Sequence, residues 1–421
     1  MDGFRPLACL LIISGTSFAE AADDWQWNLS GNARTMSESY ENIDFGLGPV
    51  DDDTWVHQRV QAMLTAEKDG LFEIAAELTW GRMWGKKQPL APPDQDDVDL
   101  LQGFMQSRIP LDSGNVLEIR AGRQDLYYGS GRLLASREGA NQRLAHDALR
   151  LSWRRSDDLR VDGFIASPVA IEPDAFDNRS HPSDLRFWSL YSTFSVNRRD
   201  SMDLYYIGLR DEESVFVENG GHETRHTVGF RYWTDGKPFI CDTETILQFG
   251  DADGRDILAG AFSLGVGRMF PDFCWKPSLV LRADAISGGD DRGKLNTFDP
   301  LFQANNYFNE GGFISPSNLY NLNPRLVLIP GEKFTLNLGV NFQWRFSPAD
   351  AVYGPTLDEI GGPAPDGQRY LGTAFNLSVE WMPDTATSVF LGYTHQDAGD
   401  SLTSIGGGDV DYLQLSLRRS F

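Results

Sequence analysis

Arginines that alternate with apolar residues are the part of this sequence best suited to chemistry. Arg59 precedes Val60, and Arg150 stands between Leu149 and Leu151. Successive side chains of a β-strand point to opposite faces, so the arginines would share one face and the apolar residues the other. In a confined channel, guanidinium groups attract anions and bind carboxylates through paired hydrogen bonds. The arginines placed on one face by this alternation are Arg59, Arg120, Arg150, Arg231, Arg282, Arg345 and Arg418.

Carboxylates on the same face allow a second interpretation of these arginines. Glu118, Asp162, Asp284 and Glu380 fall within the same alternating segments. If each arginine pairs with a neighbouring carboxylate, the inner face is polar but does not select anions. We expect the anion-attracting arrangement and keep the paired arrangement as the alternative.

The C-terminal segment, residues 409–421, alternates strictly and ends on an aromatic residue. It resembles the closing strand of a bacterial outer-membrane β-barrel, with one face toward lipid and one toward water. Leu413, Leu415 and Leu417 would face lipid together with one charged residue, Arg419. Two residues from the chain end, Arg419 can lie at the membrane interface, where the cost of a charge is small.

Similar segments recur along the chain, beginning with residues 25–33, and none is typical of a long helix. We count about 18 strands, with an uncertainty of about two, and bacterial barrels have even strand numbers. Trp344 and Trp381 fall near strand ends, where barrels carry an aromatic girdle. The sequence therefore predicts an all-β fold, a transmembrane antiparallel barrel of about 18 strands.

The connections alternate between short and long. Residues 68–70 and 383–384 are short turns, whereas residues 130–145, 288–318 and 347–368 are long. Barrels of this class place short turns in the periplasm and long loops outside the cell. We therefore expect extracellular loops at these long segments.

The N-terminus has the features of a secretory signal. Arg5 precedes the apolar residues 7–13, and Ala19, Glu20 and Ala21 form a cleavage site. We expect residues 1–21 to be removed and residues 22–421 to form one barrel domain in the outer membrane of a Gram-negative cell. Outside the signal, no continuous apolar run is long enough for a spanning helix.

Charge and cysteine content narrow the partners. The net charge of −23 disfavours nucleic acid as a partner. Cys241 and Cys274 are the only cysteines after the signal, and in an oxidising compartment they are a disulfide candidate. Strands two apart lie nearly 10 Å from each other, beyond bridging distance unless the turns bend inward. Two unpaired thiols are the alternative.

The six histidines do not suggest an enzyme. His222 and His226 have the spacing of a helical zinc pair, but four residues of a strand span about 13 Å, too far to share one ion. The sequence contains no G-x-S-x-G nucleophile motif. We expect no catalysis, no metal site and no cofactor.

Two stretches are similar to a known family. Residues 121–153 resemble the GRQ strand and following loop of the alginate export family, and residues 297–323 resemble its FDPLF segment. The similarity covers nearly the whole mature chain. It implies an outer-membrane barrel of about 18 strands with an arginine-rich constriction for a linear polyuronate.

The same resemblance assigns four further residues. By motif, Arg123 and Gln124 would line the channel, and Arg137 and Glu138 would belong to the following loop. Because Arg123 departs from strict alternation with Arg120, we expect a β-bulge at Gly122.

Together these observations predict a passive outer-membrane channel for an anionic polysaccharide or oligosaccharide, such as an alginate-like polyuronate. The alternative is a less selective porin for small anions or sugars. Expected partners are membrane lipid, lipopolysaccharide, the cargo, and periplasmic proteins of export or uptake. We expect a monomer.

Overall fold

The computed structural model describes residues 25–156, 158–217, 220–234, 237–291, 293–304 and 306–421. The predicted signal, residues 1–21, lies outside the described residues. No helix in the described ranges is long and apolar enough to cross a membrane.

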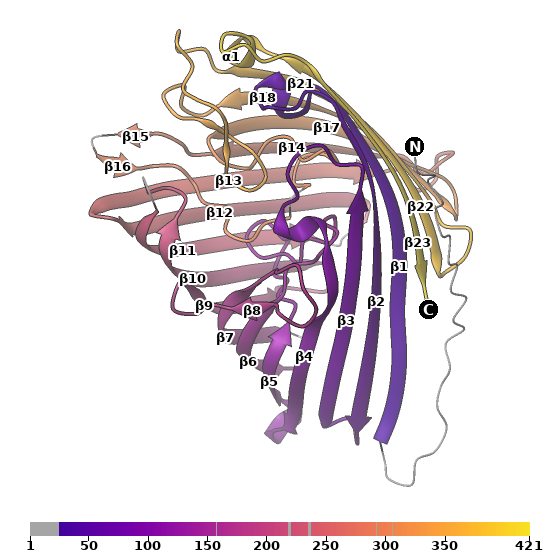
Figure 1. Cartoon of the computed structure of the whole chain (residues 1–421). Helices are drawn as coiled ribbons and strands as arrows, with labels where there is room; N and C mark the ends of the chain where they lie inside the picture. The colour runs from indigo at the N-terminus through magenta and orange to yellow at the C-terminus, as the bar shows by residue number, and fades with distance from the viewer. Residues whose placement is uncertain (1–24, 157, 218–219, 235–236, 292, 305) are drawn as a thin grey trace.

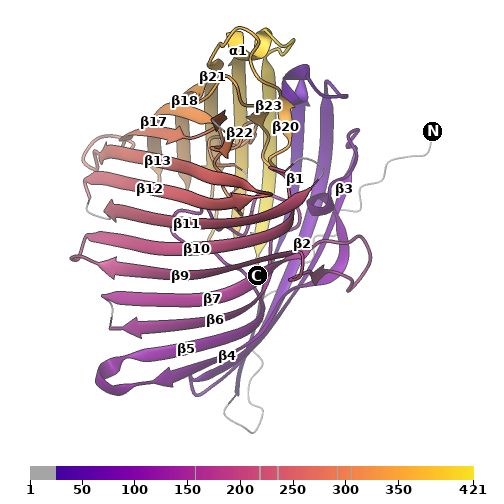
Figure 2. The ribbon, with the colours of Figure 1, turned by 90° about the vertical axis from the view of Figure 1, so that its left-hand side faces the viewer.

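The described residues form a closed antiparallel barrel of 18 strands, as predicted. Consecutive strands pair, and β1 closes the ring against β23, beside it in Figures 1 and 2. The barrel strands are β1 (Trp25–Glu41), β2 (Asp53–Lys68), β3 (Phe72–Trp84), β4 (Asp96–Pro110), β5 (Val116–Gln124), β6 (His146–Arg155), β7 (Leu159–Ala170), β9 (Leu185–Ser195), β10 (Asp200–Ser214), β11 (Gly221–Thr234), β12 (Phe239–Ala252), β13 (Arg255–Met269), β14 (Ser278–Ile286), β17 (Leu319–Gly331), β18 (Phe334–Arg345), β21 (Tyr370–Trp381), β22 (Thr387–Ala398) and β23 (Val410–Ser420).

Short elements occupy several connections. They are β8 (Arg179–Ser180), β15 (Asp290–Asp291), β16 (Lys294–Leu295), β19 (Val352–Tyr353), β20 (Glu359–Gly361), the α-helix α1 (Asp400–Thr403), and the 3₁₀ helices η1 (Ile43–Gly46), η2 (Pro92–Asp94) and η3 (Asp112–Gly114).

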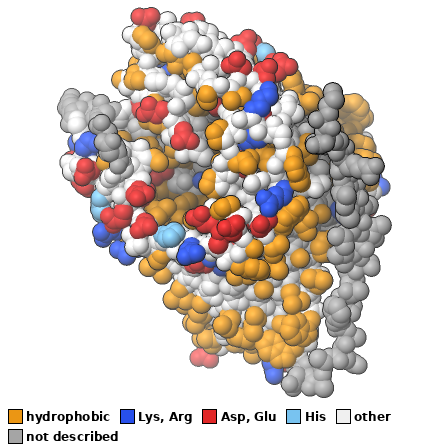
Figure 3. Space-filling model, viewed as in Figure 1, with side chains coloured by type: hydrophobic (Ala, Val, Ile, Leu, Met, Phe, Trp, Pro, Cys, Tyr) orange, Lys and Arg blue, Asp and Glu red, His pale blue; other side chains and the backbone are white. Residues whose placement is uncertain are grey.

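Alternation along the strands separates an apolar outer surface from a polar interior. In β23, Leu413, Leu415 and Leu417 are exposed, whereas Ser416 between them is buried. Figure 3 shows a broad hydrophobic area over the lower part of the molecule, below a zone where charged side chains gather. Arg419 forms an ion pair of 3.1 Å with Asp384 in the turn before β22, which confirms its place at the strand end.

Strand β17 begins earlier than the alternation predicts, and it continues on both sides of a proline. The prediction starts the strand at Pro324, yet β17 begins at Leu319. Pro324 has no N–H for the ladder, and the pairing of β17 with β18 is interrupted between Leu322 and Arg325. Nδ2 of Asn323 donates to the carbonyl of Val340 at 2.9 Å and fills the gap.

The disulfide considered from sequence is not formed, because Cys241 and Cys274 are both free. Cys241 lies in β12, and Cys274 lies in the turn between β13 and β14. Strand β13 therefore separates the two, and strands two apart are too distant for a disulfide.

Two long loops fold into the barrel and pack against each other. The inserted segment, residues 125–145, links β5 to β6, and residues 287–318 link β14 to β17. The backbone N–H of Phe302 donates to the carbonyl of Leu133 at 2.8 Å, and that of Ala135 donates to Phe302 at 2.9 Å. Leu134 and Phe302 are buried in one apolar cluster with inward side chains of the wall, including Phe187. The interior is therefore partly filled by chain.

Candidate functional site

Three arginines stand side by side on the wall where the barrel closes. Arg34 of β1 is the register partner of Arg59 of β2 and of Arg418 of β23. We call these three residues the basic row. Like charges directly opposite one another on adjacent strands are destabilising unless anions or hydrogen-bond acceptors compensate them.

The inserted segment supplies those acceptors. Arg34 donates to the carbonyls of Glu138 and Ala140, each at 2.8 Å. Arg59 donates to the same carbonyls at 3.3 and 3.1 Å, and its Nη2 contacts the Glu138 carboxylate. Arg418 Nη1 lies 3.5 Å from Glu138 Oε1. The segment is thus docked on the basic row by backbone and side chain together.

Arg143 of the inserted segment adds a fourth guanidinium to this cluster. Its Nε lies 3.3 Å from Glu138 Oε2, and its Nη2 contacts Asp125. Burial lowers the pKa of Arg143, and the positive charges of Arg59 and Arg418 lower it further. Glu138 is therefore a carboxylate shared by three arginines.

A glycine on the wall makes room for this docking. Gly81 of β3 is the register partner of Arg59. A Cβ at position 81 would lie only 2.4 Å from Nε2 of Gln142 and 2.8 Å from Nδ2 of Asn141. A side chain at position 81 would displace the amide ends of Gln142 and Asn141 from their present places.

The other side of the barrel carries carboxylates. Glu244 of β12 is opposite Ser263 of β13, which is opposite Asp284 of β14, and Asp242 precedes Glu244 by two positions. We call Asp242, Glu244 and Asp284 the acidic wall. Arg132 of the inserted segment donates to Glu244 at 2.5 Å and to Asp242 at 3.2 Å.

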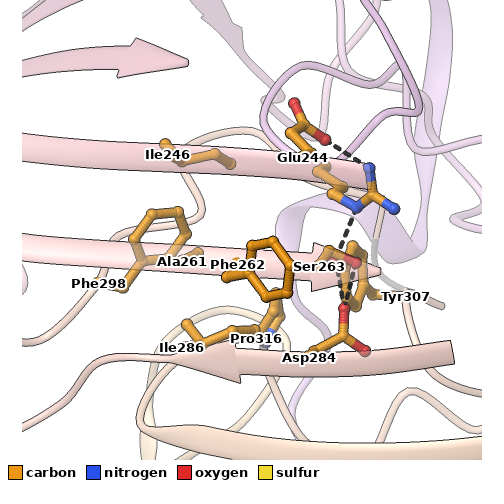
Figure 4. Close-up of a pocket in the computed structure, with 11 residues that line it drawn as sticks. Glu244, Ile246, Ala261, Phe262, Ser263, Asp284, Ile286, Phe298, Tyr307 and Pro316 are labelled. Atoms are coloured by element: carbon orange, nitrogen blue, oxygen red, sulfur yellow. Dashed lines mark hydrogen bonds and ion pairs between the residues drawn. The ribbon is translucent and has the colours of Figure 1, made fainter. Parts of the chain in front are cut away.

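Figure 4 shows the acidic wall with Glu244, Ser263 and Asp284 coming from three neighbouring strands. Tyr307 reaches the same place, and its hydroxyl accepts a hydrogen bond of 3.0 Å from Arg132 Nε. The cavity between these residues has a volume of about 10 Å³. A space of this size holds about one water molecule, so it is no site for a sugar.

The inserted segment crosses the barrel between the two charged surfaces. Arg132 is bound to β12, and Glu138 is bound to β1, β2 and β23, on the far side of the ring of strands. Six residues can span about 20 Å when extended, which suits this crossing. The site is therefore a constriction with a basic side, an acidic side and a charged strap between them.

The remaining predicted arginines mostly have carboxylate partners. Arg231 binds Asp242 at 2.7 Å, Arg282 binds Asp284 at 3.0 Å, and Arg150 binds Glu118 at 2.9 Å. Arg120 instead donates to Gln106 and lies over the ring of Phe104. Paired side chains of this kind are what the alternative interpretation predicted for the inner face.

Arg123 does not line the lumen, and the predicted bulge at Gly122 is wrong. The pairing of β5 with β4 and β6 runs through Gly122 without a register shift. Arg120, Gly122 and the buried Gln124 therefore share the inner face, and Arg123 has the opposite face. Arg123 binds Asp147 at 3.0 Å, where residues 171–184 cover it. Gln124 donates to the carbonyls of Gly122 and Ala148 at 3.2 and 3.1 Å.

The loop residue Arg137 joins the two inserted loops. Its Nε donates to the carbonyl of Gln303 at 3.2 Å, and its backbone has a positive φ of 55°. Burial lowers the pKa of Arg137, and Asp299 opposes that effect. Arg137 and Glu138 thus bind different partners from adjacent positions.

Several arginines of the interior, among them the fully buried Arg225, are not among the predicted residues. Arg34 is not predicted because the expected first strand ends at residue 33, whereas β1 continues to Glu41. Arg132 and Arg143 lie in a loop, where alternation carries no information. Arg325 follows Pro324 and is exposed, with Glu310 as its nearest opposite charge. A longer strand and the arginine content of the 130–145 loop were the available signals.

Arg325 belongs to a small polar recess in the wall. The recess has a volume of about 40 Å³ and is lined by Asn309, Glu310, Asn337 and Ser378 among others. Burial raises the pKa of Glu310. The recess holds a few water molecules and gives solvent access to a second guanidinium besides Arg418.

Two groupings of described residues have ligand atoms close enough to hold a cation. Asp96, Asp99 and Asp177 form one, and His395, Asp397 and Asp409 form the other, with ligand atoms within 4.8 Å in each. In the first grouping Asn178 Nδ2 donates to Asp96 at 2.7 Å. Neither grouping belongs to the basic row or the acidic wall.

A buried aspartate in the second loop predicts a pH effect. Burial raises the pKa of Asp299 from 3.8 to about 6; the positive charge of Arg225 opposes this rise, and the negative charge of Glu223 adds to it. The folded protein therefore binds a proton that the unfolded chain releases, and stability rises as pH falls from about 6 toward 4. Between pH 7.5 and 4.5, Asp299→Asn should remove about 2 kcal/mol of this pH-dependent gain.

Urea unfolding in detergent micelles at pH 7.5 and 4.5 measures this difference. The exposed Asp366→Asn provides the control and should keep the pH dependence of the parent protein. Equal pH dependence in the parent and the Asp299→Asn variant would show that Asp299 titrates as an ordinary carboxyl.

Comparison with known proteins gives one family and one fold. A family model described as alginate export matches residues 25–415. A search of curated proteins found no match. Because the matched range covers nearly every described strand, the family model and the barrel describe the same part of the chain.

Several solved structures share the fold at low sequence identity. OccK8 (OprE) of Pseudomonas aeruginosa is 12% identical over 94% of this chain and 98% of that chain, with a TM-score of 0.64. OccAB1 of Acinetobacter baumannii is 13% identical over 94% and 96%, with a TM-score of 0.65. OccK2 (OpdF) of Pseudomonas aeruginosa, in complex with glucuronate, is 11% identical over 94% and 98%, with a TM-score of 0.62. These likenesses establish the fold alone.

Proposed function

The chain belongs to the alginate export family, and on that basis we propose that this outer-membrane channel passes an anionic polysaccharide or oligosaccharide, an alginate-like polyuronate. Transport is passive, because the cargo diffuses along charged groups fixed to the wall. No step of this function requires bond making or breaking.

The basic row carries the proposal. A guanidinium offers a planar fork of donors that matches a carboxylate, the group repeated along a polyuronate. Arg418 is the member best placed for this role, because its side chain is 42% exposed. Its one carboxylate contact among the described residues is the 3.5 Å approach to Glu138, so it retains free donors.

Two further observations support a uronate as the cargo. Arg325 presents a second exposed guanidinium, from β17, beside the amides of Asn309 and Asn337. Amides and guanidinium groups together suit a sugar ring that carries hydroxyls and a carboxylate. OccK2, which shares the fold, has been crystallised with glucuronate, a single uronate unit.

The inserted loops favour a second candidate, a less selective porin for small anions or sugars. Residues 125–145 cross the barrel, and the loop of residues 287–318 packs against them. A constriction narrowed in this way suits single sugars better than a polymer. The two candidates differ in one measurable property: a polyuronate channel passes uronate oligomers, whereas the porin passes glucuronate alone.

Arg418→Gln should lower the anion-to-cation permeability ratio roughly threefold, because it removes an exposed positive charge from the constriction. Reversal potentials in planar bilayers under a salt gradient measure the ratio. Arg419→Gln is the matched control, because Arg419 is adjacent in sequence but on the outer face, paired with Asp384. Block of the current by uronate oligomers should weaken in the first variant alone.

The same recordings can refute the proposal. A parent channel without anion preference, whose current uronate oligomers never interrupt, is not a polyuronate channel. A channel that passes glucuronate but excludes its oligomers fits the porin instead.

A further inference from the structure

Glu138 is a carboxylate of the chain itself that lies where a cargo carboxylate would bind. Its Oε1 contacts Arg59 and lies 3.5 Å from Arg418, and its Oε2 lies 3.3 Å from Arg143. The Glu138 side chain is 44% exposed, so solutes in the lumen can reach it. An exposed carboxylate inside an arginine cluster is open to exchange with another anion.

The position of the inserted segment does not depend on this carboxylate. Arg34 and Arg59 hold the segment through four hydrogen bonds to the carbonyls of Glu138 and Ala140. Arg132 holds its other end on the acidic wall. If the carboxylate left the cluster, these backbone hydrogen bonds would keep the segment in place.

The arginines nevertheless need an anion. Arg34, Arg59 and Arg418 are direct cross-strand neighbours, and an uncompensated row of like charges is unfavourable. Arg143 brings its own partners, Asp125 and, at 3.8 Å, Glu77. Glu38 and Glu77 also interact electrostatically with Arg34 and Arg59, but Glu138 is the carboxylate in direct contact with Arg59 and Arg418, and another anion would have to take over these contacts if it left.

We propose that Glu138 is a built-in competitor for the cargo, which a carboxylate of the entering solute displaces from Arg59 and Arg418. This inference rests on the proposed function, since it concerns the same arginines. When the solute carboxylate arrives, Glu138 turns into the lumen, and when the solute leaves, Glu138 returns. The exchange keeps the basic row neutralised and prevents the cargo from binding too tightly to move on.

Glu138→Gln tests the proposal, because glutamine keeps the shape of the side chain and removes its charge. Glucuronate should then block the current at a concentration about tenfold lower than in the parent channel. The anion-to-cation permeability ratio should rise as well. Block of the current by glucuronate in planar bilayers gives the first quantity, and reversal potentials under a salt gradient give the second.

Two controls make the result specific. Glu118→Gln also removes one negative charge from the inner face of the barrel, but Glu118 lies on β5, three strands from β2, and pairs with Arg150 at 2.9 Å instead of with the basic row. The glucuronate concentration that blocks the current of this control variant should stay at the parent value. The open-channel conductance of Glu138→Gln should stay close to that of the parent, because the backbone contacts hold the segment.

The outcomes distinguish this inference from the proposed function. If glucuronate blocks Glu138→Gln as it blocks the parent channel, Glu138 does not compete with the cargo. A large rise in conductance also overturns the inference, because it would show that the Glu138 carboxylate holds the inserted segment in place. If glucuronate blocks Glu138→Gln more tightly but the channel excludes uronate oligomers, the competition by Glu138 is supported and the polyuronate channel is refuted. If glucuronate blocks both Glu138→Gln and Glu118→Gln more tightly, the effect comes from overall charge and the inference is overturned.

Discussion

Replacing the inserted segment by a two-residue turn should raise the single-channel conductance roughly threefold or more. A barrel of this strand number is wide enough for an aqueous channel, and the change leaves only the loop of residues 287–318 in its interior. The segment crosses from the acidic wall to the basic row, and its Leu134 packs on Phe302 in the interior. Its removal opens the cross-section at the narrowest charged region.

The register of the neighbouring strands allows a clean design. Gln124 of β5 and His146 of β6 are direct partners, so Asp125 and Ala145 would face each other next. An Asn-Gly turn in place of residues 126–144 then closes a regular hairpin. Replacing residues 172–176 by glycine and serine is the control, since all five are exposed and belong to the connection between β7 and β9.

Single-channel conductance of both variants in planar bilayers tests whether the inserted segment narrows the channel. The control should conduct as the parent does. A shortened channel with parent-like conductance would mean that residues 287–318 alone form the constriction, and that the inserted segment only lines it.

The barrel could be predicted from sequence because its determinants are local. Period-two alternation places Leu413, Leu415 and Leu417 outside without knowledge of any partner strand. The same rule places Arg59, Arg231 and Arg418 on the inner face, because each lies within a strand whose alternation is well marked. Alternation also places Arg123 on the outer face, and the assignment of Arg123 to the lumen is wrong because it follows the motif instead of the alternation.

The site could be predicted only in part because it depends on how loops fold back. Nothing in the spacing of residues 130–145 shows that Glu138 reaches Arg59 or that Arg132 reaches Glu244. These contacts join residues about 80 and 110 positions apart. Loop insertion is decided by packing of side chains such as Leu134 and Phe302, which alternation does not describe.

The two charged surfaces also explain how an acidic protein can present arginines to an anion. The chain carries a net charge of −23, yet the carboxylates of the acidic wall are paired with Arg132, Arg231 and Arg282, whereas Arg418 of the basic row keeps a side chain that is 42% exposed. An anion at this level of the barrel therefore meets paired carboxylates on one side and the exposed Arg418 side chain on the other. Segregation of charge, more than its sum, sets the field in a narrow channel.

Arg345 differs from the other inward arginines because it holds loops instead of facing solvent. Its side chain is fully buried, and Nε donates to Ser401 Oγ at 2.6 Å. Nη1 donates to the carbonyls of Asp350 and Gly362 at 2.7 and 2.8 Å. One side chain of β18 therefore fixes residues of two separate connections, and the predicted place of Arg345 in the cargo path has no support in these contacts.

Arg345→Met should lower the free energy of unfolding by about 2 to 4 kcal/mol, since it leaves the two carbonyls and the hydroxyl without their donor. Removing a buried charge would by itself raise the free energy of unfolding, because Arg345 has no carboxylate within 4 Å among the described residues. The loss should prevail, as three acceptors each forfeit a charge-assisted hydrogen bond. Urea unfolding in detergent micelles measures the change, with the half-exposed Arg418→Met as control and an expected loss near zero. If Arg345→Met instead altered ion selectivity at unchanged stability, Arg345 would belong to the conduction path after all.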